Sequence, residues 1–284
     1  MTFAERLNEQ VERANSLVCV GLDPDPARFP HALRELGRRE AIVAFNKAII
    51  EATSDLVCAY KPNLGFYVAQ GIDGIAALVE TRALIPAHIP VILDCKVGDM
   101  GSTATAYATG YFGEWGFDAI TANPYQGEDS LAPFLSWPDK GVFILCRTSN
   151  PSSADLQDVI LTESGDPLYL RVGSRSNQWK RDYPAGVGLV VGATYPGELA
   201  AIRERCPELP ILLPGVGAQE GDVEGSVANG IRADGTGLLV SSSRGIIYAG
   251  SGPDFAERAR LATIKLQEQV NAVRTMQSGL YSRA

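Results

Sequence analysis

Histidine is scarce in this chain of 284 residues, and several common motifs are missing. The two histidines, His31 and His88, lie beside or near prolines in segments with the character of loops. No CxxC pair and no HExxH motif occurs, which argues against a structural zinc site. No apolar run is long enough to cross a bilayer, and the charged, amphipathic residues 1–16 contain no apolar signal region. We therefore expect a cytoplasmic protein.

A surplus of positive charge is also absent. The chain has 25 Lys and Arg against 33 Asp and Glu, a net charge of −8, so a broad basic face for nucleic acid is not expected. Any phosphate must then be bound by local groups. The five cysteines are an odd number, and four lie inside apolar runs: Cys19, Cys58, Cys95 and Cys146. This placement favours buried free thiols in a reducing compartment over disulfides.

Eight short apolar segments recur along the chain, at residues 16–22, 56–62, 90–96, 119–123, 141–149, 188–194, 211–217 and 237–243. Their apolar character is continuous rather than alternating, which is typical of strands covered on both faces. Helical patterns lie between them, so the strands should form a parallel sheet. Eight such units predict a (β/α)8 TIM barrel. The alternative is a doubly wound open sheet, although no GxGxxG follows the first strand.

Helical patterns are predicted at residues 39–54, 64–84, 102–115, 196–206 and 252–273. No linker-like change in composition interrupts the chain, so we predict a single catalytic barrel domain over residues 1–284, with a helix before the first strand. A long connection at about 150–187 begins polar and later becomes helix-like. It follows a strand at the end of the barrel where lids occur, and we favour a lid or substrate-contact role for its first residues. The alternative is a surface insertion without a role.

Three charged residues, Asp94, Lys96 and Asp99, lie where the third apolar segment ends. Side chains alternate along a strand, so Asp94 and Lys96 should point the same way, into the barrel near its carboxyl-terminal mouth. Burying such charges is costly, although a structural ion-pair network remains an alternative. A lysine between carboxylates keeps its proton, which suits proton transfer to or from carbon without a metal or cofactor.

The residues just after this cluster leave two interpretations open. Asp99 or Ser102 could cap the helix that follows, which would be a purely structural role. Thr103 lies four residues beyond Asp99, so the two could instead share one face of that helix.

The segment DCKVGDMGSTA, residues 94–104, resembles the DxKxxD signature of the orotidine 5′-phosphate decarboxylase family. Further segments resemble motifs of that family, in the same order along the chain: VGLDPD at 20–25, AYKPNLGFY at 59–67, CRTSNPSSADLQ at 146–157, LPGVGAQEGD at 213–222 and SSSRGIIYAG at 241–250. The segment at 146–157 resembles the pyrimidine-contact loop of the longer bacterial branch. The resemblance covers most of the chain. It implies the predicted barrel and decarboxylation of orotidine 5′-phosphate to uridine 5′-phosphate, the last step of de novo UMP synthesis.

The resemblance also implies roles for individual residues. The catalytic residues would be Lys61, Asp94, Lys96 and Asp99. The substrate-binding residues would be Asp23, Thr103, Ser149, Pro214, Gln219 and Arg244. Asp23 would contact the ribose and Ser149 the pyrimidine. The phosphate would lie against Pro214, Gln219 and Arg244. The lysine at 96 would stabilise and then protonate the carbanion at C6, with no cofactor and no metal.

A homodimer with a composite active site is implied as well. Asp99, Met100 and Thr103 would enter the active site of the neighbouring subunit. The family usually has isoleucine where this chain has Met100, and because methionine is apolar and adaptable we expect an adjusted wall with activity kept.

Two other functions compete with this interpretation. Sugar-phosphate decarboxylases and hexulose-phosphate synthases share DxKxxD but use Mg²⁺, and they would need an acidic ligand near the second strand. Lys61 occupies that region here and would repel a cation. A non-catalytic nucleotide-phosphate binder fits the phosphate motifs but leaves the charged set unexplained.

Overall fold

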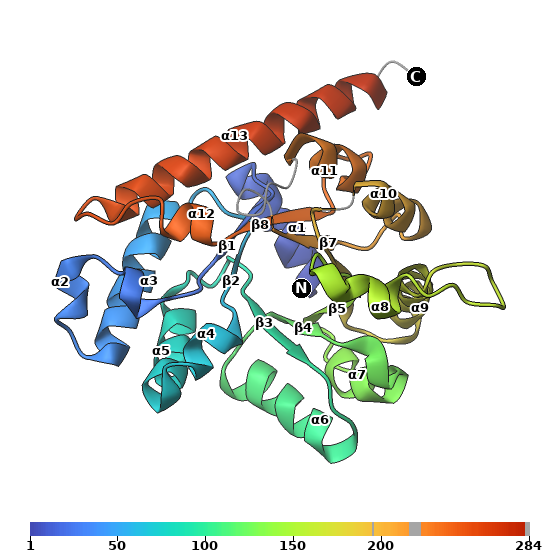
Figure 1. Ribbon diagram of the computed structural model, residues 1–284, viewed down its shortest axis with the longest axis horizontal. Coiled ribbons are helices and arrows are strands. Elements are labelled where there is room, and N and C mark those ends of the chain that lie inside the picture. Colours follow the sequence, from blue (N-terminus) through green and yellow to red (C-terminus); the bar gives the residue numbers. More distant parts are fainter. Residues whose placement is uncertain (195, 216–222, 282–284) are drawn as a thin grey trace.

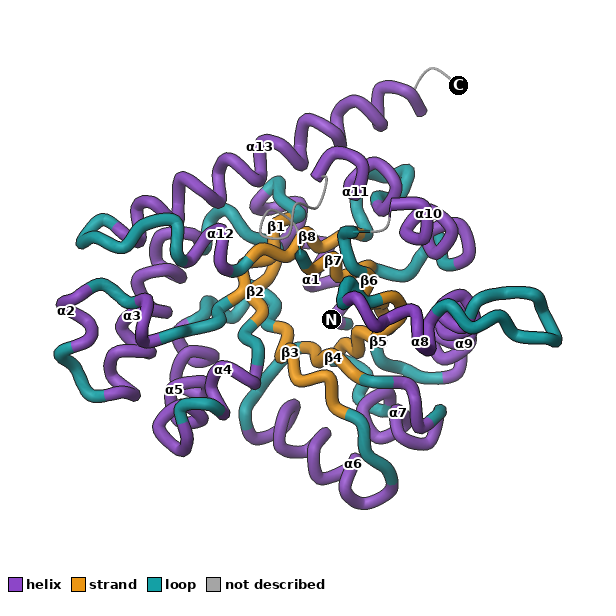
Figure 2. The backbone as a smooth tube through the Cα atoms, in the orientation of Figure 1, coloured by secondary structure: helices purple, strands orange, loops and turns teal. Residues whose placement is uncertain are grey.

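The computed structural model describes residues 1–194, 196–215 and 223–281 (Figure 1). Its sheet has eight strands: β1 (Val18–Gly21), β2 (Ala59–Lys61), β3 (Ile92–Val97), β4 (Ala119–Ala122), β5 (Gly141–Arg147), β6 (Gly186–Val191), β7 (Ile211–Pro214) and β8 (Leu238–Ser242). Neighbouring strands pair in parallel in the order β2-β1-β8-β7-β6-β5-β4-β3. Isolated parallel bridges, Tyr60 to Val91 and Asn63 to Asp94, bring β2 and β3 together (Figure 2). The predicted barrel is confirmed, and the open sheet is not formed.

Helices surround the strands as an outer ring in Figure 1, except the first one, which lies behind the strands at the amino-terminal end of the barrel. They are α1 (Phe3–Ala14), α2 (His31–Arg34), α3 (Arg38–Thr53), α4 (Leu64–Val68), α5 (Gly71–Leu84), α6 (Gly101–Ala108), α7 (Glu128–Leu135), α8 (Ala154–Gln157), α9 (Leu168–Asp182), α10 (Pro196–Arg205), α11 (Val223–Gly230), α12 (Arg244–Ile247) and α13 (Phe255–Tyr281). Single turns add η1 (Pro26–Arg28), η3 (Pro124–Gln126) and η4 (Pro151–Ser153), and the π-helical η2 (Thr109–Glu114) continues α6.

The core lies between the strands and this ring. Every residue of β1, β2, β4 and β8 is buried, as expected for strands without a solvent face. In α3, the apolar residues Ile42, Phe45 and Ile49 are buried on one face, which fits their helical spacing. Burying a large apolar side chain of this kind contributes about 1.5–3 kcal/mol to folding. The apolar residues that predicted the strands and helices are thus the residues that form the core.

The segment predicted as one helix at 64–84 is two helices, and this prediction was wrong. Gly71 has a left-handed backbone with φ of +69°, which glycine adopts without the cost that a Cβ brings, and the chain turns there. Gly74 lets the two helices pack closely, since a Cβ at this position would lie 2.0 Å from the carbonyl oxygen of Tyr67. The sequence pattern is helical on both sides of the break, so periodicity alone did not reveal it.

The long connection after β5 contains η4, α8 and α9, with one antiparallel bridge from Ile160 to Pro167 between them. The bridged loop extends away from the barrel beside α9 in Figure 1. Since β6 begins at Gly186, the connection ends slightly before the predicted residue 187.

Two further observations bear on the sequence predictions. Over the described ranges, no helix combines the length and the apolar character needed to cross a membrane. The cysteines are free, and Cys19, Cys58, Cys146 and Cys206 are buried. Burial raises the pKa of the Cys19 thiol to about 12, because the thiolate would lose its hydration there.

Candidate active site

Asp94 is the centre of a hydrogen-bonded cluster at the carboxyl end of the barrel. Its Oδ1 accepts from Lys96 Nζ at 2.6 Å and from Thr121 Oγ1 at 2.9 Å. Its Oδ2 accepts from Lys61 Nζ at 3.0 Å and from Asn63 Nδ2 at 3.1 Å. Each carboxylate oxygen therefore has one charged and one neutral donor, and strands β2, β3 and β4 contribute to the cluster together with the residues just after β2. The carboxylate is held in one orientation from four directions.

Two of the charged residues of the cluster are buried, and they pair with each other. Lys61 and Asp94 are only 5% and 8% exposed, so each would be costly to ionise alone. Burial opposes the charge on Lys61, but Asp94 and Asp23 outweigh it and raise the pKa of this ammonium above its usual range. Burial likewise disfavours the Asp94 carboxylate, but Lys61 and Lys96 hold its pKa well below the usual range. Lys61 and Asp94 are therefore arranged to stay charged near neutral pH.

Lys96 differs from Lys61 in its access to solvent. The side chain of Lys96 is 46% exposed, against 6% for Lys61, although both contact Asp94. Its ammonium thus bonds to the buried carboxylate while the side chain borders the open end of the barrel. A ligand bound at this end can reach Lys96, whereas Lys61 is buried. Asp94 and Lys96 do meet, but not through the regular alternation on which the prediction was based, because β3 is irregular between Leu93 and Val97.

Asp99 is not part of the cluster within one chain. It follows β3 on the loop to α6, and its Oδ1 accepts a hydrogen bond from the Met100 amide at 2.8 Å. Among the described residues, neither lysine of the cluster pairs with it. The N-cap of α6 is Met100, with no side-chain cap, so neither Asp99 nor Ser102 caps this helix as we had considered. Met100 is 59% exposed, and Thr103 is exposed on α6.

Asp23 connects three strands at the same end of the barrel. It follows β1, is 8% exposed, and its Oδ1 accepts from the Asn63 amide at 3.0 Å. Its carbonyl oxygen accepts from the Tyr248 hydroxyl at 3.1 Å. Gly21 permits the close approach of this segment to β8, since a Cβ there would lie 2.6 Å from the Cβ of Ser243. Asn63 thus links Asp23 directly to Asp94.

Ser149, Pro214 and Arg244 lie at or just after the carboxyl ends of β5, β7 and β8, the same end as Asp94. Ser149 is half-buried beside Gly192, where a Cβ would lie 2.9 Å from the Cβ of Ser149. Pro214 ends β7, and Arg244 is the exposed first residue of α12. Gln219 lies outside the described residues. The structure therefore brings these described positions to one end of the barrel, as predicted.

Arg147, the last residue of β5, organises the start of the long connection. It is only 2% exposed and donates to the Ser153 hydroxyl at 2.8 Å and to Gln157 Oε1 at 3.2 Å. It also pairs with Asp158 at 3.2 Å. Gln157 Oε1 in turn accepts from the Thr148 amide at 2.9 Å. The segment around Ser149 is therefore fixed from both sides.

Sequence reasoning missed three residues of this site, namely Asn63, Thr121 and Arg147. Thr121 carried a signal, because it is the one polar residue in the strand Ala119–Ala122. Asn63 carried a similar signal, since it lies two positions after Lys61 and can therefore face the same side of the extended chain.

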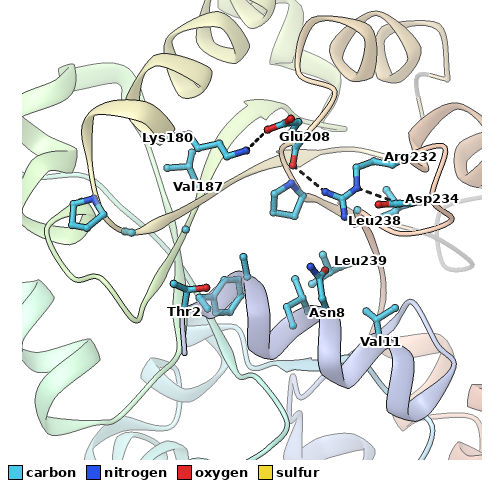
Figure 3. A pocket seen from close by; sticks show the side chains of 18 of the residues that line it. Thr2, Asn8, Val11, Lys180, Val187, Glu208, Arg232, Asp234, Leu238 and Leu239 are labelled. Atoms are coloured by element: carbon cyan, nitrogen blue, oxygen red, sulfur yellow. Dashed lines mark hydrogen bonds and ion pairs between the residues drawn. The ribbon is translucent and has the colours of Figure 1, made fainter.

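A cavity of about 490 Å³ lies at the opposite, amino-terminal end of the barrel, between α1 and the starts of β6 and β8 (Figure 3). Its charged side chains pair with one another, Lys180 with Glu208 at 2.6 Å and Arg232 with Asp234 at 3.5 Å. None of the predicted site residues lines this cavity.

Throughout the described ranges, no three His, Cys, Asp or Glu side chains gather as metal ligands. The carboxyl-end cluster is thus the candidate active site.

The fold and this cluster define a (β/α)8 barrel with an alternating Lys–Asp–Lys array at its carboxyl end. The chain belongs to the orotidine 5′-phosphate decarboxylase / HUMPS family, whose model matches residues 16–259. The family membership suggested by the sequence motifs is confirmed.

Curated relatives and solved structures agree with this assignment. The chain is 52% identical over 279 residues to the orotidine 5′-phosphate decarboxylase of Thermomicrobium roseum, covering 98% of each chain. It is also 52% identical to the enzyme of that name from Herpetosiphon aurantiacus, covering 91% of this chain and 94% of the relative. The structure of Leishmania donovani OMP decarboxylase superposes with a TM-score of 0.83 at 42% identity, covering 97% of this chain and 99% of that one.

Proposed function

We propose that this protein decarboxylates orotidine 5′-phosphate to uridine 5′-phosphate, without a cofactor, as a cytoplasmic enzyme of pyrimidine biosynthesis. The observation that carries the proposal is the Asp94 carboxylate held between Lys61 and Lys96 at the open end of the barrel. The names of the relatives point to the same reaction. A charged array of this kind is suited to a reaction in which negative charge develops on carbon.

The proposed chemistry uses the exposed lysine as the acid. The bond from C6 to the carboxylate carbon breaks, CO₂ leaves, and the electron pair stays at C6. The Lys96 ammonium stabilises that charge, transfers a proton to C6, and regains a proton from solvent. Asp94 lies beside the substrate carboxylate and disfavours the bound ground state by charge repulsion. Lys61 keeps Asp94 ionised, as its 3.0 Å contact and burial support.

Binding of the substrate is proposed to use the ends of several strands. Asp23 would accept from ribose hydroxyls, and Ser149 would hydrogen-bond to the pyrimidine. The phosphate would lie against Pro214, Gln219 and Arg244. Arg244 is exposed, and it forms no ion pair with any residue that the structure describes, so its guanidinium is available for a phosphate.

The active site is proposed to be completed by a second subunit. Within one chain, Asp99 stands outside the Lys61–Asp94–Lys96 cluster and bonds to its own neighbour. Met100 and Thr103 are exposed beside it. A homodimer in which these three residues enter the partner's site would supply the fourth charge and cover an apolar side chain.

A Mg²⁺-dependent sugar-phosphate enzyme of the same family is the competing function. Such an enzyme would place its metal near the ends of β2 and β3. In this chain the Lys61 ammonium lies 3.0 Å from Asp94, where it would repel a divalent cation. A non-catalytic phosphate binder is the other alternative, and it gives no reason for two lysines paired with one buried carboxylate.

The first test is to incubate the purified protein with orotidine 5′-phosphate and EDTA and to follow loss of the orotate absorbance. We expect rapid, complete conversion to uridine 5′-phosphate at a rate that added Mg²⁺ does not change. Turnover that requires Mg²⁺, or turnover of sugar phosphates alone, would support the metal-dependent alternative. Tight binding of uridine 5′-phosphate without any turnover would support the binding protein.

A further inference from the structure

Strand β3 contains an irregularity at the residues of the charged cluster. Leu93 pairs with Ile120 of β4, but the next pairing joins Val97 to Ala122. Three residues of β3, at positions 94–96, therefore lie opposite one residue of β4, which is Thr121. A bulge of this kind removes regular ladder hydrogen bonds and redirects side chains.

The backbone of Lys96 is unusual within this bulge. Its φ is +47°, one of two positive values at residues other than glycine in the described chain. A side chain with a Cβ adopts this left-handed region at a cost, so the surrounding structure has to hold it there. The same local geometry brings Lys96 Nζ to 2.6 Å from Asp94 Oδ1. The position of the ammonium thus depends on a backbone conformation that must be stabilised by neighbours.

Thr121 supplies that stabilisation through its side chain. Its Oγ1 accepts a hydrogen bond from the Lys96 amide at 2.9 Å. Because an amide can only donate here, the threonine proton is free to go to Asp94 Oδ1, which lies 2.9 Å away. The Thr121 carbonyl also accepts from Cys95 Sγ at 3.3 Å. One β4 residue, itself 1% exposed, therefore contacts all three residues of the bulge.

We propose that Thr121 is a positioning residue for the reaction, whose hydroxyl fixes the Lys96 backbone and the Asp94 carboxylate in one geometry. It does not touch the substrate; it acts through the acid and its counter-charge. The proposal rests on the decarboxylase function argued above. A lysine that shifts relative to C6 by even 1 Å loses much of its effect on the transition state, because the reaction depends on the distance between opposite charges.

The alternative is that Thr121 contributes only to the packing between β3 and β4. Its methyl group and its hydroxyl can be separated by substitution. Thr121→Val keeps the branched shape and removes the hydroxyl, which leaves the Lys96 amide without its acceptor. Thr121→Ser keeps the hydroxyl and removes the methyl group. Thr263→Val is the matched control, because Thr263 is also fully buried but lies on α13, and its hydroxyl donates to the Ala259 carbonyl within that helix.

The experiment measures turnover of orotidine 5′-phosphate, binding of uridine 5′-phosphate, and hydrogen exchange of the Lys96 amide in the full-length protein. For Thr121→Val we expect kcat to fall about 100-fold, product affinity to stay within about threefold, and the Lys96 amide to exchange at least about tenfold faster. Thr121→Ser should keep kcat within about fivefold of the unaltered protein and keep the amide protected. Thr263→Val should resemble the unaltered protein in kcat and in exchange at Lys96.

Three results would overturn the proposal. The first is a kcat for Thr121→Val within about threefold of the unaltered protein. The second is a kcat for Thr121→Ser as low as that of Thr121→Val, which would assign the effect to the methyl group. The third is a parallel loss of kcat and product binding, which would indicate general disruption. If the unaltered protein does not decarboxylate orotidine 5′-phosphate, the proposed function fails by itself. Exchange of the Lys96 amide then still decides whether the Thr121 hydroxyl holds the bulge.

Discussion

The ammonium of Lys96 lies 2.6 Å from the Oδ1 of Asp94, and only one residue separates Lys96 from Asp94 along β3. In a regular strand, side chains two positions apart are parallel and separated by nearly two residue rises. The bulge in β3 removes that separation and turns both groups toward each other. The acid proposed for the reaction and the carboxylate that pairs with it are thus built into one short segment of chain.

Replacing Lys96 by alanine tests whether this ammonium is the proton donor. We expect Lys96→Ala to fold, to bind uridine 5′-phosphate, and to lose at least about 10⁴-fold in kcat, because both charge stabilisation and the proton at C6 are lost. Orotate absorbance and product titration measure the two quantities separately. The control is Lys47→Ala, which removes an exposed lysine of α3 paired with Glu51 at 3.8 Å and should keep full activity. Substantial turnover by Lys96→Ala would mean that the proton comes from another group.

The barrel could be predicted because its strands are buried on both faces. Each of the eight apolar segments overlaps one observed strand, and the strand residues of β1 and β4 are all buried. What escaped prediction is local backbone geometry. The break at Gly71 and the bulge at Asp94–Lys96 depend on single φ angles and on contacts from other strands. Periodicity reports which face of a segment is buried, so it cannot locate such deviations.

The active site, like the fold, could be predicted from the sequence only in part. Lys61, Asp94 and Lys96 were identified from their motifs, and the fold brings them together as expected. Thr121 is the one polar residue of its strand, but the sequence does not show which residues it contacts, because its role arises from the pairing of β3 with β4. The contribution of Asp99 stays a prediction, since its proposed partner groups belong to a second subunit.

Arg244 offers a test of phosphate recognition. We expect Arg244→Ala to lower kcat/KM for orotidine 5′-phosphate at least about 100-fold, because two charge-assisted hydrogen bonds to the phosphate are lost. Steady-state kinetics with orotidine, which lacks the phosphate, is the sharpest control. The variant and the unaltered protein should use orotidine equally poorly. An equal loss on both substrates would show that Arg244 acts on something other than the phosphate.

The charged cluster should also make stability depend on pH. The pKa of Asp94 is held below its usual range by the two lysines against the cost of burial. The contribution of the ionised Asp94 to the free energy of unfolding is therefore fully present above the unfolded pKa of about 3.9. This contribution is lost as the pH falls through the lower pKa of the folded state. Urea unfolding between pH 3 and pH 6, at about half-unit steps, should show a decline in acid that is roughly 1 kcal/mol smaller in Asp94→Asn, because only the loss between the unfolded pKa and pH 3 falls in this range. Parallel curves for the two proteins would mean that Asp94 titrates normally.

Mixing two inactive variants tests whether the active site is shared between subunits. If Asp99 acts in the partner's site, a dimer of one Lys96→Ala chain and one Asp99→Ala chain has one site lacking both groups and one site with both intact. An equal, fully exchanged mixture should then recover about one quarter of the unaltered activity, since half the dimers are mixed and each has one intact site. Each variant alone supplies the baseline, and mixing Lys96→Ala with Asp94→Asn is the control that should recover nothing, because both groups belong to the same chain's cluster. If Asp99 served its own chain's site, the first mixture would stay as inactive as its components.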